Sequence, residues 1–192
     1  MDEAKKIELR VRWWFHLAVF IILVILSFTY YTKTEPRGAL DYTFPFGPLE
    51  YAILPFHEAG HFIFAIFGDF WGALGGTIVQ FGLPLAFSLY FFLARKDHFA
   101  GGAAAFWFFS QFFGVSVYMR DARFMILPLF GGGEHDWNYL FGQLHLLNKS
   151  VQIADAMRIT GLLGITADLL FLVFLLVRDR SGEAFRKEPQ DG

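Results

Sequence analysis

Residues 49–67 read LEYAILPFHEAGHFIFAIF, an apolar stretch with two histidines and a glutamate near its centre. In an α-helix, residues four apart lie one above the other on the same face, so the rings of His57 and His61 project together. This spacing allows both imidazoles to bind one Zn²⁺ at about 2.0–2.1 Å. Glu58 lies beside that face, where a carboxylate can take a proton from an attacking water and pass it to a leaving amine.

The apolar setting of these three ionisable groups supports a functional interpretation. An ionisable side chain at the centre of a membrane costs about 2.5–3.5 kcal/mol on insertion scales. A sequence that places three such groups near the centre of one apolar stretch needs a partner that compensates for the cost. The alternative interpretation is that the three groups pair only with one another and with neighbouring backbone.

Composition places the chain among membrane proteins. Of its 192 residues, 55% are hydrophobic, 20% are aromatic and only 18% are charged, whereas soluble domains carry about 25% charged residues. The mean hydropathy is +0.43, and a soluble domain of this length cannot bury so much apolar surface. A net charge of −2 gives no sign of nucleic-acid binding, and the absence of cysteine excludes disulfides and thiolate metal ligands.

Six apolar segments, bounded by polar or turn-rich stretches, predict an all-α, polytopic transmembrane helix bundle. The fifth segment is interrupted by three glycines, so we expect one broken or re-entrant span. The whole chain, 1–192, is expected to form a single transmembrane domain with a basic N-terminal segment (1–12), a membrane core (13–177) and a polar tail (178–192). The segments are 13–31, 49–67, 73–93, 99–118, 124–147 and 159–177.

The distribution of basic residues predicts an orientation. With six spans and the N-terminus inside, ten Lys and Arg residues lie inside and six outside; if segment 124–147 does not cross, the two counts are equal. The first apolar segment is long and no small-residue cleavage site follows it, so we favour a retained helix over a cleaved signal peptide. We expect an integral, multi-pass protein of a prokaryotic cell membrane, in contact with lipid and with no nucleic-acid partner. Its oligomeric state is left open.

A catalytic zinc site needs a third protein ligand and an open fourth position. Candidates near the middle of other spans are His135 and Asp136 in segment 124–147 and Asp168 in segment 159–177. We choose Asp136 as the third ligand and keep His135 as the main alternative, although both would fit a polar loop at the membrane surface as well. The remaining candidates are Glu134, Asp168 and Asp121.

Two further polar residues lie within apolar segments and have two interpretations each. Asp168 can orient a histidine ligand by accepting its second N–H, or it can form a hydrogen bond that packs two helices. Gln80 can hold the substrate or stabilise an oxyanion near the metal, or it can form an interhelical hydrogen bond.

The combined pattern resembles a known family, the site-2-protease-type intramembrane zinc metalloproteases. The matching residues are His57, Glu58 and His61 within a hydrophobic span, followed by Asp136 in a glycine-containing break of another span. The resemblance covers about residues 49–147. The His-Glu-x-x-His pattern is its specific part.

The resemblance implies hydrolysis of peptide bonds inside the membrane. It implies two histidines and one aspartate on zinc, here His57, His61 and Asp136, with Glu58 as general base. The family's usual second motif is an Asp-Gly pair, whereas Asp136 is followed by Trp137. This departure indicates a divergent and compact branch.

The function predicted from the sequence is therefore that of a zinc-dependent, membrane-embedded endopeptidase, with a membrane protein or peptide as its substrate. The main alternative is a non-proteolytic metal-binding membrane protein descended from such a protease, for example a sensor or a chaperone. A metal-dependent lipid hydrolase or oxidase and a cation transporter are further alternatives. The six histidines are too few for a di-iron lipid oxidase.

Overall fold

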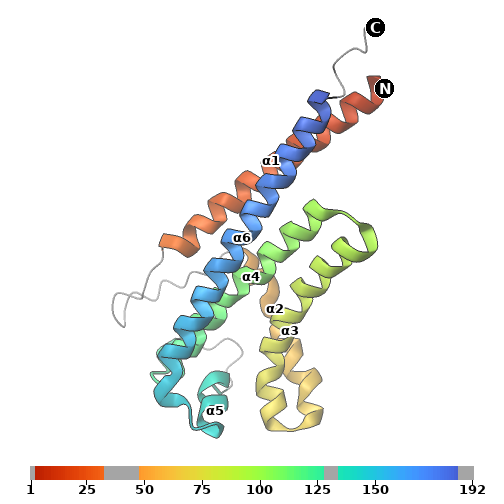
Figure 1. Cartoon of the computed structure of the whole chain (residues 1–192). Coiled ribbons are helices and arrows are strands. Elements are labelled where there is room, and N and C mark those ends of the chain that lie inside the picture. The colour runs from red at the N-terminus through yellow and green to blue at the C-terminus, as the bar shows by residue number, and fades with distance from the viewer. Residues whose placement is uncertain (1–2, 33–47, 128–133, 186–192) are drawn as a thin grey trace.

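The computed structural model describes residues 3–32, 48–127 and 134–185, and every regular element in these ranges is helical (Figure 1). The expectation of an all-α fold is thus confirmed for the described residues. The α-helices are α1 (Glu3–Thr32), α2 (Pro48–Phe64), α3 (Asp69–Leu89), α4 (His98–Asp121), α5 (Asp136–Gln143) and α6 (Ser150–Phe185). Short helical turns add η1 (Ala65–Phe67), η2 (Tyr90–Arg95) and η3 (Leu147–Lys149).

Four of these helical stretches are long and apolar enough to cross a membrane, namely Glu3–Thr32, Asp69–Arg95, His98–Asp121 and Leu147–Arg180. The other two segments expected to cross contain shorter helices. α2 has 17 residues, and in segment 124–147 the regular helix is the eight-residue α5. Gly131–Gly133, the expected break, lies outside the described residues, so the count of six spans and the broken segment stay predictions.

Large apolar side chains lie exposed along most of the helices. Phe28 on α1 is 68% exposed, Phe62 on α2 is 80% exposed and Leu163 on α6 is 66% exposed. Soluble monomers rarely expose contiguous apolar patches larger than a few hundred Å². This surface is typical of a protein whose outer face meets lipid.

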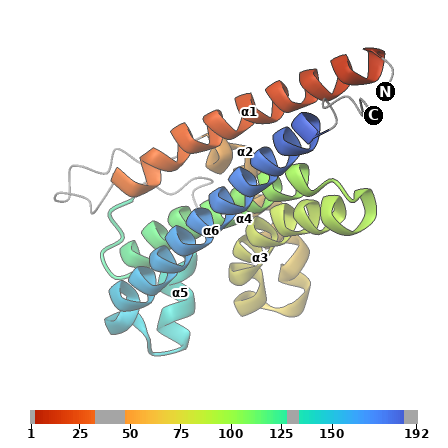
Figure 2. The same ribbon diagram turned by 45° about the horizontal axis from the view of Figure 1, so that its top comes forward.

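The helices pack around α4. The most extensive contacts join α4 to α6 and α2 to α3, and α4 also touches α1, α2, α3 and α5. In Figures 1 and 2, α1 and α6 run side by side and bring both termini to the same end of the molecule. One apolar cluster joins α1, α4 and α6: Leu23, Tyr30, Phe99, Phe106, Phe113, Ile165, Leu172, Leu175 and Leu176.

α2 and α3 form an antiparallel pair that meets through glycines. Gly68, whose φ of 99° favours glycine, joins η1 to α3. Further along, a Cβ atom at Gly60 would lie 2.9 Å from the Gly76 Cα, and one at Gly75 would lie 2.6 Å from the Phe64 Cβ. Small residues allow helix backbones to approach this closely. The approach brings the buried face of α2 directly onto α3.

Candidate metal centre

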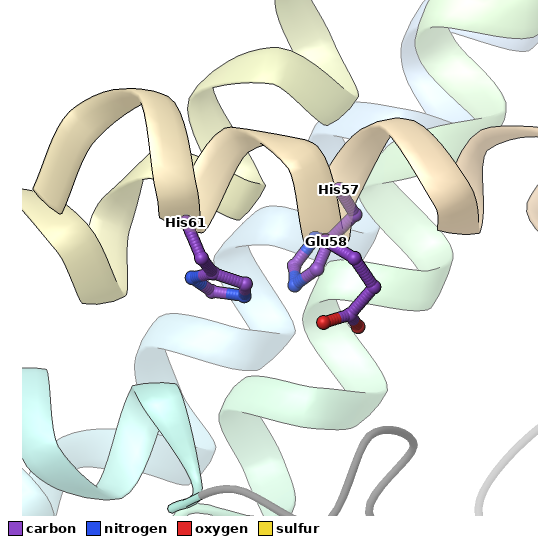
Figure 3. A group of neighbouring side chains, drawn as sticks. All are labelled: His57, Glu58 and His61. Carbon is purple, nitrogen blue, oxygen red and sulfur yellow. The ribbon is translucent and has the colours of Figure 1, made fainter.

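The buried face of α2 carries the His-Glu-x-x-His residues. Glu50, Ile53, His57 and Gly60 are buried at helical spacing, and His61 follows on the same side. Figure 3 shows the side chains of His57, Glu58 and His61 projecting from one side of α2. One ligand atom from each of these three residues lies within 4.8 Å of the other two. The helical spacing thus produces the cluster that the sequence predicts.

Asp136, the first residue of α5, reaches this cluster. Its Oδ2 atom lies 3.5 Å from the Nε2 atom of His57 and 3.4 Å from the Nε2 atom of His61. A tetrahedral zinc site with bonds of about 2.0–2.1 Å separates its ligand atoms by about 3.3–3.4 Å. The Asp136 carboxylate oxygen therefore stands from each imidazole nitrogen at a distance that fits an edge of a zinc tetrahedron. The donor set and its spacing fit the ion.

The second nitrogen of His61 is held by backbone. Its Nδ1 atom lies 2.8 Å from the carbonyl oxygen of Gly72 on α3. A carbonyl oxygen can only accept a hydrogen bond, so Nδ1 carries the proton and donates it. In the neutral ring, Nε2 then keeps its lone pair and faces Asp136. The fold selects the tautomer that a metal ligand needs.

Two side-chain amides, those of Gln111 and Gln80, determine the tautomer of His57. Gln111 donates from Nε2 to the carbonyl oxygen of Trp107, at 3.2 Å, so its Oε1 atom turns toward Gln80. Gln80 donates from Nε2 to that oxygen at 3.2 Å, which leaves its own Oε1 atom 2.9 Å from the Nδ1 atom of His57. His57 therefore donates from Nδ1 and keeps the lone pair on Nε2. Gln80 thus bridges helices and also contacts a candidate ligand.

Gly76 lies against both rings. It lies on α3 between Gly72 and Gln80, the two residues that accept from the histidines. A Cβ atom at position 76 would lie 2.6 Å from the Nε2 atom of His57 and 2.7 Å from that of His61. The lack of a side chain at this position keeps both Nε2 atoms accessible.

His135, the alternative ligand, faces away from this centre. Its Nδ1 atom accepts a hydrogen bond from the backbone N–H of Asn138, at 3.2 Å. In the neutral ring the proton therefore lies on Nε2, which is 3.3 Å from the Oδ2 atom of Asp121. Asp121 and His135 form a buried pair of their own. Glu134, the residue before them, is exposed.

Asp168 lies apart from the candidate metal centre. It is 7% exposed and packs on α6 against Gly102, near the start of α4. Gln111 and Tyr118, which contact Gln80 and Asp136, lie in the later turns of α4. The Asp168 Oδ2 atom has no hydrogen-bond partner among the described residues. The orienting role considered for Asp168 gains no support from this placement.

Sequence reasoning missed two residues that contact the site. Gln111 is a lone amide within an apolar segment, and such a residue is a signal in itself because polar groups in membrane helices are costly. Tyr118 accepts a hydrogen bond from the backbone N–H of Asp136, at 3.2 Å. A tyrosine near the end of an apolar segment carries no comparable signal, since tyrosines are common there.

Comparison with known proteins adds no relative: no protein-family model, no curated protein and no solved structure matches this chain.

Proposed function

We propose that this protein is a membrane-embedded zinc endopeptidase that hydrolyses peptide bonds of membrane proteins or peptides, as in the site-2-protease-type family that its sequence resembles. The observation that carries the proposal is the approach of Asp136 Oδ2 to within 3.4–3.5 Å of both Nε2 atoms. His57, His61 and Asp136 are the proposed zinc ligands, and Glu58 is the proposed general base.

Each residue of the centre has a defined chemical part in the proposed reaction. Zinc supplies Lewis acidity, which lowers the pKa of water to about 7 and polarises a substrate carbonyl. Glu58 accepts the proton of the attacking water and delivers it to the nitrogen of the leaving amine. Gln80 holds His57, and Gly72 holds His61, in the ligand tautomer.

A substrate helix has to unwind locally before it can react. Its peptide groups are closed in helical hydrogen bonds and covered by side chains, so the carbonyl is not open to attack. The exposed apolar surface of α2 and α3 offers a route from the lipid to the centre. We propose that the substrate approaches laterally along this surface.

We also propose that the protein is multi-pass in a prokaryotic cell membrane. The four long apolar helices support several crossings. The six spans predicted from hydropathy require in addition that α2 and the segment around α5 cross. The position of the turn between α3 and α4 relative to the N-terminus distinguishes the two counts.

The test of the catalytic assignment is the substitution Glu58→Gln in the full-length protein, reconstituted in proteoliposomes with a membrane-spanning peptide. We expect zinc to remain bound in stoichiometric amount, while the cleavage rate falls about 10²–10⁴-fold because the proton acceptor is lost. Glu8→Gln, on the exposed part of α1, is the matched control and should cleave like the unmodified protein. Retained cleavage by Glu58→Gln rejects the role of Glu58.

The test of the metal assignment is the zinc content of His57→Ala and Asp136→Ala. Each substitution removes one of three ligands, so each should lower zinc occupancy at a fixed concentration of free zinc. Stoichiometric zinc without cleavage of any membrane peptide would favour the non-proteolytic alternative. An unmodified protein that binds no zinc rejects the proposed site.

A further inference from the structure

The last turn of α4 holds the beginning of α5. Tyr118, Asp121 and Ala122 lie three and four residues apart and therefore share one face of α4. The Tyr118 hydroxyl accepts a hydrogen bond from the backbone N–H of Asp136, at 3.2 Å. The carbonyl oxygen of Ala122 accepts one from the side-chain amide of Asn138, at 2.7 Å. Two of the first three residues of α5 are thus tied to the same turn.

Asp121 is a buried, charged member of this face and contacts His135. Asp121 is 1% exposed and His135 is 4% exposed, and 3.3 Å separates Oδ2 from Nε2. The Asp121 carboxylate also accepts backbone N–H groups from Ile126 and Leu127, each at 3.0 Å. These two backbone donors around one buried carboxylate compensate in part for the loss of water.

The ring of His135 is held by a capping contact and by stacking, whereas its Nε2 atom stands 3.3 Å from the Asp121 carboxylate without a hydrogen-bond partner among the described residues. Its Nδ1 atom caps α5 by accepting from the N–H of Asn138, so its protonated Nε2 points to Asp121. The Tyr118 ring stacks on it, with a centroid distance of 4.1 Å and an interplanar angle of 27°. Since His135 directly precedes Asp136, an immobile His135 leaves Asp136 little freedom at its backbone.

We infer that Asp121 and His135 are positioning residues of the proposed zinc site: their contact fixes the start of α5, so that the Asp136 carboxylate stays at ligand distance from His57 and His61. The inference rests on the proposed function, because it assigns these residues a role through a zinc ligand. Neither residue is itself a ligand. Partners that hold metal ligands typically contribute 10–100-fold to metal affinity.

The substitution His135→Asn isolates the contact with Asp121. Asparagine is a favoured N-cap residue and can still accept from the N–H of Asn138, but its side chain is too short to replace the imidazole at Asp121. We expect the Kd for zinc, measured by chelator competition on the full-length protein in detergent, to rise about 10–100-fold. Asp121→Asn replaces one acceptor oxygen with an NH₂ group, which cannot accept from the N–H groups that face Asp121. We expect it to raise the Kd for zinc by a similar factor.

Asp155→Asn is the matched control. Asp155 on α6 forms an ion pair with Arg120, so this substitution removes a carboxylate that acts on the same turn of α4 but not on α5. Its Kd for zinc should equal that of the unmodified protein. The helix content of each metal-free variant, measured by circular dichroism, should also be unchanged.

A double-variant cycle separates positioning from general destabilisation. In the Asp136→Ala background the two imidazoles still bind zinc weakly. If His135 acts through Asp136, then adding His135→Asn to that background should leave the Kd for zinc unchanged. An equal loss in both backgrounds, or an unchanged Kd in both His135→Asn and Asp121→Asn, overturns this inference and leaves the proposed function standing. No zinc binding by the unmodified protein overturns both.

Discussion

A neutral imidazole has one nitrogen with a free lone pair, and the partner of the other nitrogen decides which one it is. In this protein the tautomers of His57 and His61 are both determined by backbone carbonyl groups. The Gly72 carbonyl acts directly on His61, and the Trp107 carbonyl acts on His57 through Gln111 and Gln80. Two neighbouring histidines of one motif thus depend on two different helices for the same tautomer.

The substitution Gln111→Leu tests the amide chain. Without Gln111, the Gln80 amide nitrogen loses its hydrogen-bond acceptor among the described residues, and either the oxygen or the nitrogen of Gln80 can face His57. We expect the Kd for zinc to rise about tenfold or more, as for other residues that orient metal ligands. Gln152→Leu, at an exposed position of α6, is the control. Unchanged affinity in Gln111→Leu would show that the Gln80 orientation does not depend on this chain.

The substitution Gly76→Ala tests the space in front of the two imidazoles. The new methyl group would lie 2.6–2.7 Å from both Nε2 atoms, closer than carbon and nitrogen can approach without moving. We expect zinc binding to be lost, as measured by metal analysis of the purified protein. Gly82→Ala on the same helix, where nothing lies within 4 Å of the added atom, should bind zinc normally. Full zinc occupancy in Gly76→Ala would contradict the proposed ligand geometry.

The sequence predicts that His57 and His61 lie together, but it does not predict which residue approaches them. Helical geometry alone brings His57 and His61 together, because their spacing is one turn. The approach of Asp136 depends on how α4 and α5 pack, which no local pattern determines. Sequence reasoning therefore left Asp136 and His135 as alternatives, although the structure turns one toward the histidines and the other toward Asp121.

Hydropathy locates the helices but underestimates their length. The last apolar segment was expected over 159–177, whereas α6 runs over Ser150–Phe185; the first was expected over 13–31, whereas α1 is Glu3–Thr32. Helical hydrogen bonds continue into polar flanks as long as no residue breaks them, while hydropathy records only the apolar part. The centres of the helices are therefore predictable and their ends are not.

The contact between α2 and α3 gives a prediction for stability. A Cβ atom at Gly75 would lie 2.6 Å from the Phe64 Cβ and press on the Gly60 backbone, so Gly75→Ala must separate the two helices. We expect a loss of about 1–3 kcal/mol in the free energy of unfolding, typical of overpacking, measured in a denaturing-detergent titration. Gly82→Ala is again the control and should be neutral or stabilising, because alanine favours helix. A neutral Gly75→Ala would show that the helices are less tightly packed there.

Across the whole molecule, the arrangement of the long helices makes a prediction about topology. In both overall views, the turn between α3 and α4 lies toward the same end as the two termini (Figures 1 and 2). Four crossings place this turn on the same side of a membrane as the N-terminus, whereas six crossings place it on the opposite side.

Single cysteines can locate the turn, because the chain has no cysteine of its own. We expect Arg95→Cys and Lys5→Cys to be labelled by a membrane-impermeant thiol reagent from the same side of sealed vesicles. Phe28 is 68% exposed on an apolar helix, so we expect it to face lipid and Phe28→Cys to resist the reagent in intact membranes. Labelling of positions 5 and 95 from opposite sides would support six spans and reject four.

The position of Asp136 in the chain has a consequence for biosynthesis. The ribosome makes α2, α3 and α4 before the residue that approaches the paired imidazoles. A nascent polypeptide that ends before α5 therefore holds two of the three proposed ligands and lacks the carboxylate. Under the proposed assignment, the hydrolytic centre matures late, when most of the protein has already been synthesised.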